Sequence, residues 1–390
     1  MAYFPYGDES LPIAQMAVDR FCAQEVTAVG PAYRCACFAV PSKLLRKLAD
    51  KAGEADRHVI HDHMESASRL RTQRSAWVPQ APAASPPQAL HTAPSYRRSV
   101  FDAGTDTELP GKPVRDEGDK PVKDHAANQA YDNAGITLDF YREVFGRHSI
   151  DNRSMRVESA VHFGKNFGNA MWTGDRMVYG DGDQNVSGFT AALDIIAHEL
   201  THGVTQHMIA GGLGVVRVAP KDREFKEQTH ALQGQSGALN ESFSDVFGSM
   251  VKQWHAGQDV TQANWLLGEH MLAPQHGRAI RSLQDPGNRQ LTWYEDEQFK
   301  NMDQYVDGAD VHDGSGIPNH AFYLAARKIG GYSWEKAGPI WYEAFAKLKP
   351  KASFQDAARA TTDVASQQFG VKSKECKAVM SAWQAVKVIT

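Results

Sequence analysis

Cysteine is scarce in this sequence, and the four that occur in 390 residues are Cys22, Cys35, Cys37 and Cys376. Cys35 and Cys37 are too close together to make a ready pair, so a disulfide framework is not expected. Long apolar runs are missing as well, because none approaches the roughly 20 residues that span a bilayer. The sequence therefore predicts neither a disulfide-stabilised scaffold nor a membrane protein.

An excess of one charge is also absent. The formal net charge is −4 and 23% of the residues are charged, which gives no reason to expect nucleic acid or an anionic membrane as a partner. The first ten residues, MAYFPYGDES, contain no basic segment followed by an apolar one, so no export signal of the usual kind is expected. We expect a protein that is cytoplasmic as made, with extracellular release by another route as the alternative.

The length and composition describe an ordinary globular protein. Hydrophobic residues make up 42% of the chain, and 390 residues are too many for one ordinary core, so two or three units are expected. A proline- and alanine-rich stretch at residues 79–96 has too little large apolar surface to pack, and we predict that it is an extended linker. It separates an N-terminal unit, residues 1–78, from a larger unit that begins at residue 97.

The N-terminal unit is predicted to be small and mostly helical. One helix spans about residues 41–53 and a second spans about residues 54–74. The second helix carries His58, His61 and His63. These histidines form either a metal site or a solvated polar face, and we favour the polar face because no cysteine or ordered set of carboxylates accompanies them.

The larger unit is predicted to have a strand-rich half, residues 97–202, and a helical half, residues 203–390. In the first half, a helix, an alternating strand and a hairpin are expected at residues 124–145, 155–163 and 169–179. In the second half, helix periodicity is found at residues 236–257, 316–330, 334–348 and 354–388. Residues 180–185 resemble the start of an EF-hand loop, but Val186 and Ala192 stand where its glycine and final glutamate belong, so a structural turn is expected.

The chemistry centres on the sequence HELTH at residues 198–202. On a helix, His198 and His202 project from one face, one turn apart, and two imidazoles at that spacing can bind one Zn²⁺. Glu199 beside them can take a proton from a water at the metal. The motif alone also occurs in helices that bind no metal, so a third ligand is needed.

The sequence NESFSD at residues 240–245 supplies that ligand. Glu241 and Asp245 are four residues apart on a predicted helix that is otherwise mostly apolar, so buried carboxylates there need partners. Glu241 can complete a His₂Glu site with one position left for water, and Asp245 can accept the free ring N–H of a zinc-bound histidine. The HExxHxxGxxH pattern is excluded, because Met208 stands where its third histidine would be.

These motifs resemble those of the thermolysin family of zinc metallopeptidases. Further segments match in the family's order: NAMW at 169–172, MVYGDG at 177–182, IRS at 280–282 and the stretch 307–319. The resemblance covers about residues 97–390 and implies an α+β fold, with the zinc site in a cleft between a strand-rich half and a helical half. The N-terminal unit resembles the short propeptide of the protealysin branch of the family.

The resemblance also implies roles for further residues. His312 matches the histidine that stabilises the tetrahedral intermediate, Asp307 matches the acid that orients it, and Arg281 matches the arginine that holds a substrate carbonyl. Asn240 and Asp245 are implied to support the zinc ligands from behind.

The implied substrate lies along the edge at Asn169 and Ala170. A large apolar side chain, Leu or Phe, is expected after the scissile bond. Its pocket is implied to be lined by Ile195, Leu267, Met271 and Ile280.

The sequence departs from the family pattern near the substrate side. Extra residues at about 214–231 follow the HExxH helix, and Leu232 stands where the family usually has a substrate-contacting tyrosine. Asp313 follows His312 where a hydrophobic residue is usual, and we expect this acid to raise the pKa of His312.

The family's paired calcium site also differs. Asp194 and Glu269 remain as possible calcium ligands, but Lys252, Asn264 and Leu266 stand where acids would be. Because a lysine ammonium can neutralise the remaining carboxylates, we expect one Ca²⁺ or none.

The expected function is that of a zinc endopeptidase made as a zymogen, a monomer with one catalytic Zn²⁺ and its own N-terminal unit as inhibitor. A catalytically weakened homologue that acts as a binding protein is one alternative, and a zinc hydrolase of non-peptide substrates is another. For the N-terminal unit, a folding aid or docking module is the alternative to an inhibitor. A thiolate of Cys35 or Cys37 on the zinc is a further option.

Overall fold

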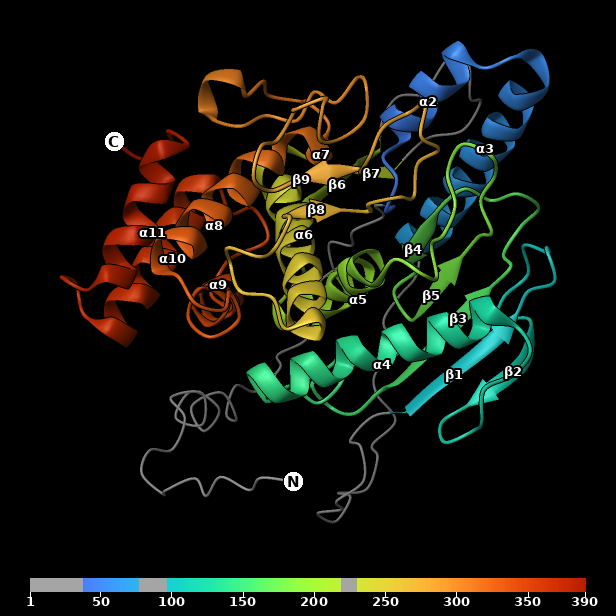
Figure 1. Ribbon diagram of the computed structural model, residues 1–390, viewed down its shortest axis with the longest axis horizontal. Helices are drawn as coiled ribbons and strands as arrows, with labels where there is room; N and C mark the ends of the chain where they lie inside the picture. Colours follow the sequence, from blue (N-terminus) through green and yellow to red (C-terminus); the bar gives the residue numbers. More distant parts are fainter. Residues whose placement is uncertain (1–37, 77–96, 219–229) are drawn as a thin grey trace.

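The structure is a computed structural model that describes residues 38–76, 97–218 and 230–390 (Figure 1). The predicted linker and the three cysteines Cys22, Cys35 and Cys37 lie outside the described residues, so a thiolate contact to a metal is not addressed. Cys376 is buried and carries a free thiol. No helix in the described ranges has the length and apolar character that crossing a membrane requires.

The described part of the N-terminal unit contains two helices, α2 (Ser42–Lys51) and α3 (Glu54–Ala76), close to the predicted bounds. Pro41 is the N-cap residue of α2, and its φ of −58° suits the entry to a helix. Leu44, Leu45 and Leu48 share the buried face of α2. Figure 1 shows the two helices in blue, with α3 beside strands β4 and β5 of the larger unit.

The histidines of α3 do not share one environment, and the prediction of a common solvated face is wrong for His63. His58 is exposed and His61 is half-buried, whereas His63 is only 2% exposed. His63 lies on the helix face that docks on the larger unit, at helical spacing from the buried residues Ile60, Met64, Ala67 and Leu70.

A five-stranded mixed sheet forms the strand-rich half, in the order β2-β1-β3-β5-β4. Its strands are β1 (Arg97–Asp102), β2 (Lys112–Asp116), β3 (Arg156–Val161), β4 (Ala170–Trp172) and β5 (Arg176–Tyr179). β1 and β5 both run parallel to β3, while β2 and β4 are antiparallel to their neighbours. The predicted strand and hairpin are therefore confirmed, and β4 is an edge strand.

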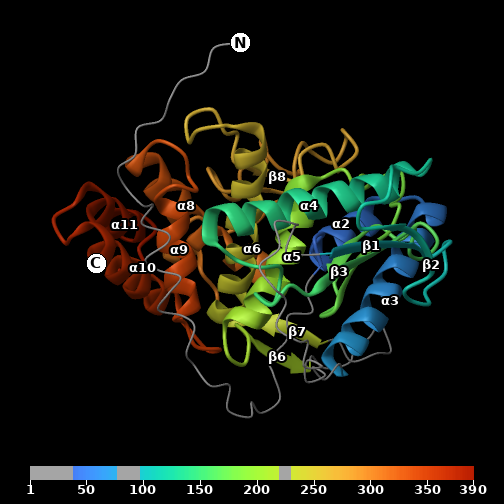
Figure 2. The same cartoon turned by 90° about the horizontal axis from the view of Figure 1, so that it is seen from below.

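Helix α4 (His125–Phe145) lies along this sheet, as both Figure 1 and Figure 2 show. The Asp124 side chain accepts the N–H groups of Ala126 and Ala127 at its start, and Gly146 ends it with a φ of 62°. Residues 180–185 form a turn, in which the Asp183 side chain accepts the N–H groups of Asn185 and Val186.

Helices dominate the second half. They are α5 (Leu193–Met208), α6 (Gly234–Ala256), the one-turn helix α7 (Val311–Gly314), α8 (Gly316–Ile329), α9 (Ala337–Ala346), α10 (Phe354–Phe369) and α11 (Lys374–Ala385), with a 3₁₀ turn η1 (Met302–Gln304). The single helical stretch predicted at residues 354–388 is two helices, because Gly370 has a φ of 94° and breaks it. This half and the mixed sheet confirm the predicted α+β fold, a strand-rich half followed by a helical half.

The extra residues after α5 begin and end in a two-stranded antiparallel hairpin, β6 (Val215–Val218) and β7 (His230–Gln233). Residues 219–229 between them lie outside the described residues. A second short pair, β8 (Leu266–Leu267) and β9 (Arg281–Ser282), joins two of the segments implied to contact substrate.

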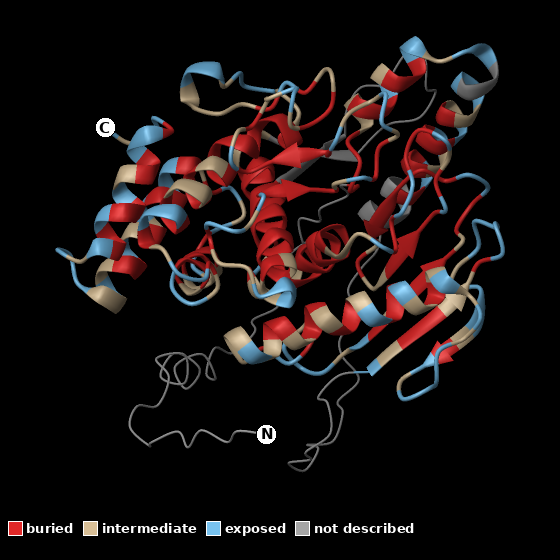
Figure 3. Ribbon diagram, viewed as in Figure 1, coloured by how far each residue is buried: buried red, intermediate tan, exposed pale blue. Residues whose placement is uncertain are grey.

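Helices α5 and α6 cross in the middle of the molecule and are buried along most of their length (Figure 3). The crossing is close because Gly248 has no side chain: a Cβ there would lie 2.4 Å from the backbone oxygen of Asp194. This close approach brings the HExxH motif of α5 against the acidic residues of α6.

Candidate active site

The predicted metal ligands converge at the α5–α6 crossing. The Nε2 atoms of His198 and His202 are 3.0 Å apart, and each lies 3.5 Å from a carboxylate oxygen of Glu241. All three residues are buried, with exposures of 3% or less. Two ring nitrogens and a carboxylate at these separations can face a single ion.

Each ring has a side-chain oxygen close to the nitrogen on its far side. His198 Nδ1 lies 2.8 Å from Asp245 Oδ1, and His202 Nδ1 lies 2.8 Å from Asn240 Oδ1. Because acceptors at Nδ1 keep the proton there, both Nε2 lone pairs are directed at the shared point. The donor set of two imidazoles and one carboxylate, so oriented, fits a zinc site with a fourth position left open.

Asp245 is the centre of a wider network. Its carboxylate also accepts from Nε and Nη2 of Arg281, at 3.0 and 2.8 Å, and from the side-chain amide of Asn319 at 2.8 Å. Burial alone raises the pKa of this carboxyl, but Arg281 and His198 outweigh it and hold the pKa below its usual value. Asp245 therefore stays charged beside the histidine.

Glu199 lies next to the ligand cluster and is fully buried. One of its oxygens accepts the backbone N–H of Trp172 at 2.9 Å, and the other has no hydrogen-bond partner among the described residues. Burial raises the pKa of Glu199 to about 7, against the opposing charges of His202 and His198. A carboxyl with a pKa near neutrality suits both uptake and release of a proton. The role of the Trp172 backbone was not foreseen, since no side chain marks it.

His312 joins the site from α7, but its carboxylate partner is Asp310 and not Asp307. Asp310 Oδ1 accepts from His312 Nδ1 at 2.7 Å and also from its backbone N–H at 2.9 Å, while Asp307 is exposed. Asp310 is the N-cap of α7, and its spacing of two residues before a histidine is the signal that could have identified it.

His312 Nε2 lies 3.2 Å from Glu241. Although burial lowers the pKa of His312, the carboxylates of Glu241 and Asp310 raise it well above its usual value. The rise was expected, but these two carboxylates cause it and not the neighbouring Asp313.

The N-terminal unit reaches into this site through Ala39 and Val40. Ala39 donates its N–H to the backbone oxygen of Ala170 (3.2 Å), and its carbonyl accepts from Nη1 of Arg281 (3.3 Å). The Asn169 side chain binds Val40 twice, accepting from its N–H at 2.9 Å and donating to its carbonyl at 3.0 Å. All three residues predicted to bind substrate backbone thus contact this segment.

The apolar residues predicted to line the substrate pocket are all buried in the main hydrophobic core of the described residues, to which Ala39 and Val40 also belong. They are Ile195, Leu267, Met271 and Ile280. Gly268 lies among them, and a Cβ there would lie 2.7 Å from Ile280.

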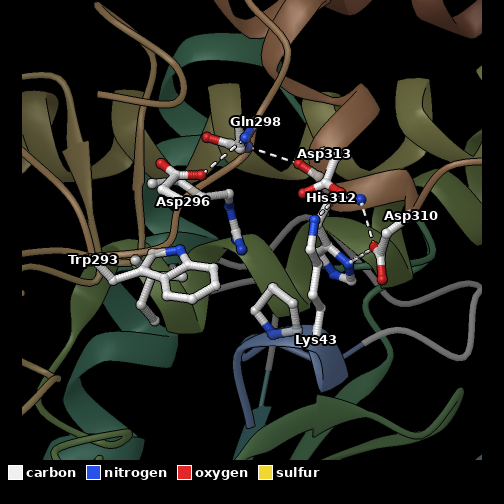
Figure 4. A pocket seen from close by; sticks show the side chains of 10 residues that line it. Lys43, Trp293, Asp296, Gln298, Asp310, His312 and Asp313 are labelled. Atoms are coloured by element: carbon white, nitrogen blue, oxygen red, sulfur yellow. Dashed lines mark hydrogen bonds and ion pairs between the residues drawn. The ribbon is translucent and has the colours of Figure 1, made fainter. Parts of the chain in front are cut away.

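Figure 4 shows a small cavity between α2 and the segment that carries His312. Lys43 reaches across it to Asp313 (2.7 Å) and to Glu297 (2.6 Å). Burial raises the pKa of Asp313 to about 6 even beside this lysine. Two further lysines of α2 extend the row, because Lys47 and Lys51 both pair with Glu295, at 2.8 and 2.7 Å.

The two carboxylates predicted as possible calcium ligands are each paired with a cation. Asp194 accepts from Nζ of Lys252 at 3.0 Å, and Glu269 accepts from Arg278 at 2.8 to 2.9 Å. Asn264 also donates to Glu269, at 2.6 Å.

Comparison with known families identifies both halves of the larger unit. Residues 91–206 match the thermolysin metallopeptidase catalytic domain, and residues 230–388 match the thermolysin metallopeptidase α-helical domain.

Similar proteins carry related names. An extracellular metalloprotease of Pectobacterium carotovorum subsp. carotovorum is 39% identical over 90% of this chain and 96% of its own length. A thermolysin from Alicyclobacillus acidocaldarius subsp. acidocaldarius is 34% identical over 74% of this chain and half of its own length. The solved precursor of protealysin, a metalloproteinase from Serratia proteamaculans, is 36% identical with a TM-score of 0.73, covering 90% of this chain and all of the other.

Proposed function

The chain belongs to the thermolysin family of metallopeptidases, and from this premise we propose that it is a zinc endopeptidase made as an inactive zymogen. The observation that carries the zymogen proposal is the set of hydrogen bonds between Ala39–Val40 and the cleft. A chain that occupies Asn169, Ala170 and Arg281 denies these groups to a substrate. The protealysin precursor, which aligns with 90% of this chain, supports the same view of the N-terminal unit.

The direction of Ala39–Val40 supports a substrate-like mode of binding. Ala39 binds the backbone of Ala170, and the residue after Ala39, Val40, binds the side chain of Asn169, which precedes Ala170. The two segments therefore run antiparallel. A substrate bound in the same direction would run along β4 toward Trp172, whose N–H binds Glu199. An extended substrate on the same edge would carry its scissile carbonyl to the proposed base.

For the chemistry, we propose His198, His202 and Glu241 as the ligands of one zinc ion. Bound there, zinc would lower the pKa of a water and polarise the substrate carbonyl. Asn240 and Asp245 hold the histidine rings in the ligating tautomer. Lys252 and Arg278 support the further proposal of one calcium ion or none, since they already neutralise the remaining acids.

Glu199 is the proposed general base, which takes a proton from the attacking water and passes it to the leaving amine. Its pKa of about 7 supports that double role. His312, kept cationic by its carboxylate neighbours, would stabilise the oxyanion of the tetrahedral intermediate. Arg281 would hold a substrate carbonyl, as it holds that of Ala39.

The substrates are proteins and peptides, with a proposed preference for Leu or Phe after the scissile bond. The apolar and buried character of the four family positions, Ile195, Leu267, Met271 and Ile280, supports this preference. We propose a monomer that acts outside the cell after removal of the N-terminal unit, in keeping with the name of the Pectobacterium relative.

The test compares the full chain with its Glu199→Gln variant. Mass spectrometry should show the native chain cut between the two units, with casein and a fluorogenic peptide hydrolysed only afterwards. Glu199→Gln should bind zinc but should neither cut itself nor hydrolyse peptides. Peptide turnover by Glu199→Gln would refute the assignment of the base, and full activity of the uncut native chain would refute the zymogen.

A further inference from the structure

His63 stands out at the junction between the N-terminal unit and the larger unit. It is 2% exposed, and neither of its ring nitrogens has a hydrogen-bond partner among the residues that the structure describes. The ring packs edge-on against Phe167, with centroids 6.4 Å apart and planes at 78°. It also lies directly over Gly168, where a Cβ would come within 2.9 Å of Nδ1.

This position is directly behind the segment that occupies the cleft. Gly168 is followed by Asn169, whose side chain forms hydrogen bonds with both the N–H and the carbonyl of Val40. Phe167 also makes an edge contact with Phe38, at 6.2 Å, just before Ala39. The ring of His63 therefore packs on the same short stretch of backbone that holds the inhibitory segment.

Among the described residues, the charged groups that act on this ring are Asp62 and Asp183, and neither forms a hydrogen bond with it. Asp62 is its neighbour on α3 and is exposed, while Asp183 belongs to the turn after β5. Asp183 is engaged by the N–H groups of Asn185 and Val186. Burial lowers the pKa of His63, and the opposing effects of Asp183 and Asp62 do not restore it.

We propose that His63 is a pH-sensitive latch, whose protonation in mildly acidic medium loosens α3 from the β4 edge and thereby opens the cleft. A second proton on the ring would place a cation without an acceptor in an apolar contact. The undocked unit exposes the ring to water, where the cation costs nothing. The inference rests on the proposed inhibitory role of the N-terminal unit and adds the signal that releases it.

The sign of the effect follows from the two states. In the undocked state His63 titrates near its ordinary pKa of about 6.5, whereas docking lowers this pKa. Docking is therefore at full strength above about pH 6.5 and weakens as the pH falls toward the docked pKa. Over that window the equilibrium constant for release increases by up to about tenfold for each unit by which the pH falls.

Asp313 is a second titrating group at the junction, because its pKa of about 6 lies in the same range and Lys43 is its partner. A pH effect on the wild-type chain alone would not separate the two groups. Variants of His63 do separate them, because Asp313 contributes equally to every form compared.

The experiment uses the full chain with Glu199→Gln, which is not expected to cut itself. Hydrogen exchange of residues 42–70, corrected for the intrinsic rate, is followed by mass spectrometry from pH 7.5 to 5.0. Three further variants are measured in this background: His63→Phe and His63→Leu, which cannot be protonated, and His58→Gln as a control on the exposed side of α3.

The expected result is that exchange in the parent and in His58→Gln increases by up to about tenfold per unit below pH 6.5, beyond the increase in the His63 variants. Equal pH profiles for all four chains would overturn the latch. If His63→Phe is too large to dock, His63→Leu, which is smaller, carries the comparison. The latch would also be overturned if His63→Phe and His63→Leu were undocked at every pH and exchange in the parent did not change with pH beyond the intrinsic rate.

A second measurement keeps the two proposals apart. The chain with Glu199 intact is shifted from pH 7.5 to 5.5 and then assayed with a fluorogenic peptide. A shorter lag in this chain than in its His63→Leu variant supports the proposed role of His63. Absence of peptide hydrolysis at every pH would refute the proposed function, while the exchange profiles would still decide whether His63 controls docking.

Discussion

Replacing Gly168 with alanine should weaken docking of the N-terminal unit without changing the active site itself. A Cβ at residue 168 would lie 2.9 Å from Nδ1 and 3.0 Å from Cε1 of His63, and 3.1 Å from a methyl group of Val186. The histidine contact exists only when the unit is docked, whereas the Val186 contact exists in both states. Gly168 is absent from the residues with positive φ, so alanine fits its backbone.

The size of the effect follows from the crowding. Contacts under about 3 Å force one group to move, and the His63 ring is confined by Phe167. Overpacking of a buried site by one methyl group typically costs about 1–3 kcal/mol. Because this cost falls on the docked state alone, the equilibrium for release should increase by about 5- to 150-fold.

The assay follows the lag before peptidase activity develops in the full-length Gly168→Ala chain at pH 7.5, and the final activity after processing. The lag should shorten, and the final kcat/KM should match that of the wild type. Gly53→Ala is the matched control, since a Cβ there would have no atom of a described residue within 4 Å apart from those of its chain neighbours. An unchanged lag, or a processed enzyme that has lost activity, would show that Gly168 does not serve docking alone.

Three further changes probe other contacts. Lys43→Ala should weaken docking by about 1 kcal/mol, since its ion pairs are partly exposed, and should shorten the same lag about fivefold; an unchanged lag would show that these pairs do not hold the unit. Asp310→Asn should lower kcat/KM of the processed enzyme by at least about tenfold, and Asp307→Asn should leave it unchanged; the reverse order would restore Asp307 as the partner of His312. Lys252→Met should lower the free energy of unfolding by about 1–3 kcal/mol, because the carboxylate of Asp194 loses its cationic partner; thermal and denaturant melts measure the loss.

Most of the fold could be predicted because its signals are local. Asp124 and Gly146 mark the two ends of α4, and the turn at residues 173–175 marks the hairpin. The break at Gly370 was the exception, since a glycine within a periodic stretch does not reveal its φ before the structure is known.

That the proposed metal ligands lie close together could be predicted for a different reason. HExxH fixes two ligands by helix geometry alone, and two acids on the apolar helix α6 had few ways to be satisfied other than at a metal or an arginine. The structure shows both outcomes: Glu241 faces the histidines and Asp245 binds Arg281 as well as His198.

The contacts that could not be predicted depend on packing between distant segments. Asp310 and Asp307 are both acids in one irregular loop, and only the start of α7 at Val311 determines which of them reaches the ring. His63 looked like its neighbours on α3 until docking buried one side of the helix. Ala39 and Val40 carry no chemical signal at all, because they bind through the backbone.

The contacts that hold the N-terminal unit fall into two groups with different consequences. Asn169 and Arg281 bind Ala39–Val40 in the docked state and are the proposed substrate contacts in the free enzyme, so a change at either alters inhibition and catalysis together. Lys43 and His63 act only in the docked state. If substrate binds these two residues as proposed, it competes with Ala39–Val40 for them, and bound peptide would shift the chain toward release by mass action. Control by pH or charge must therefore act through the second group, which is where the buried histidine and the lysine row lie.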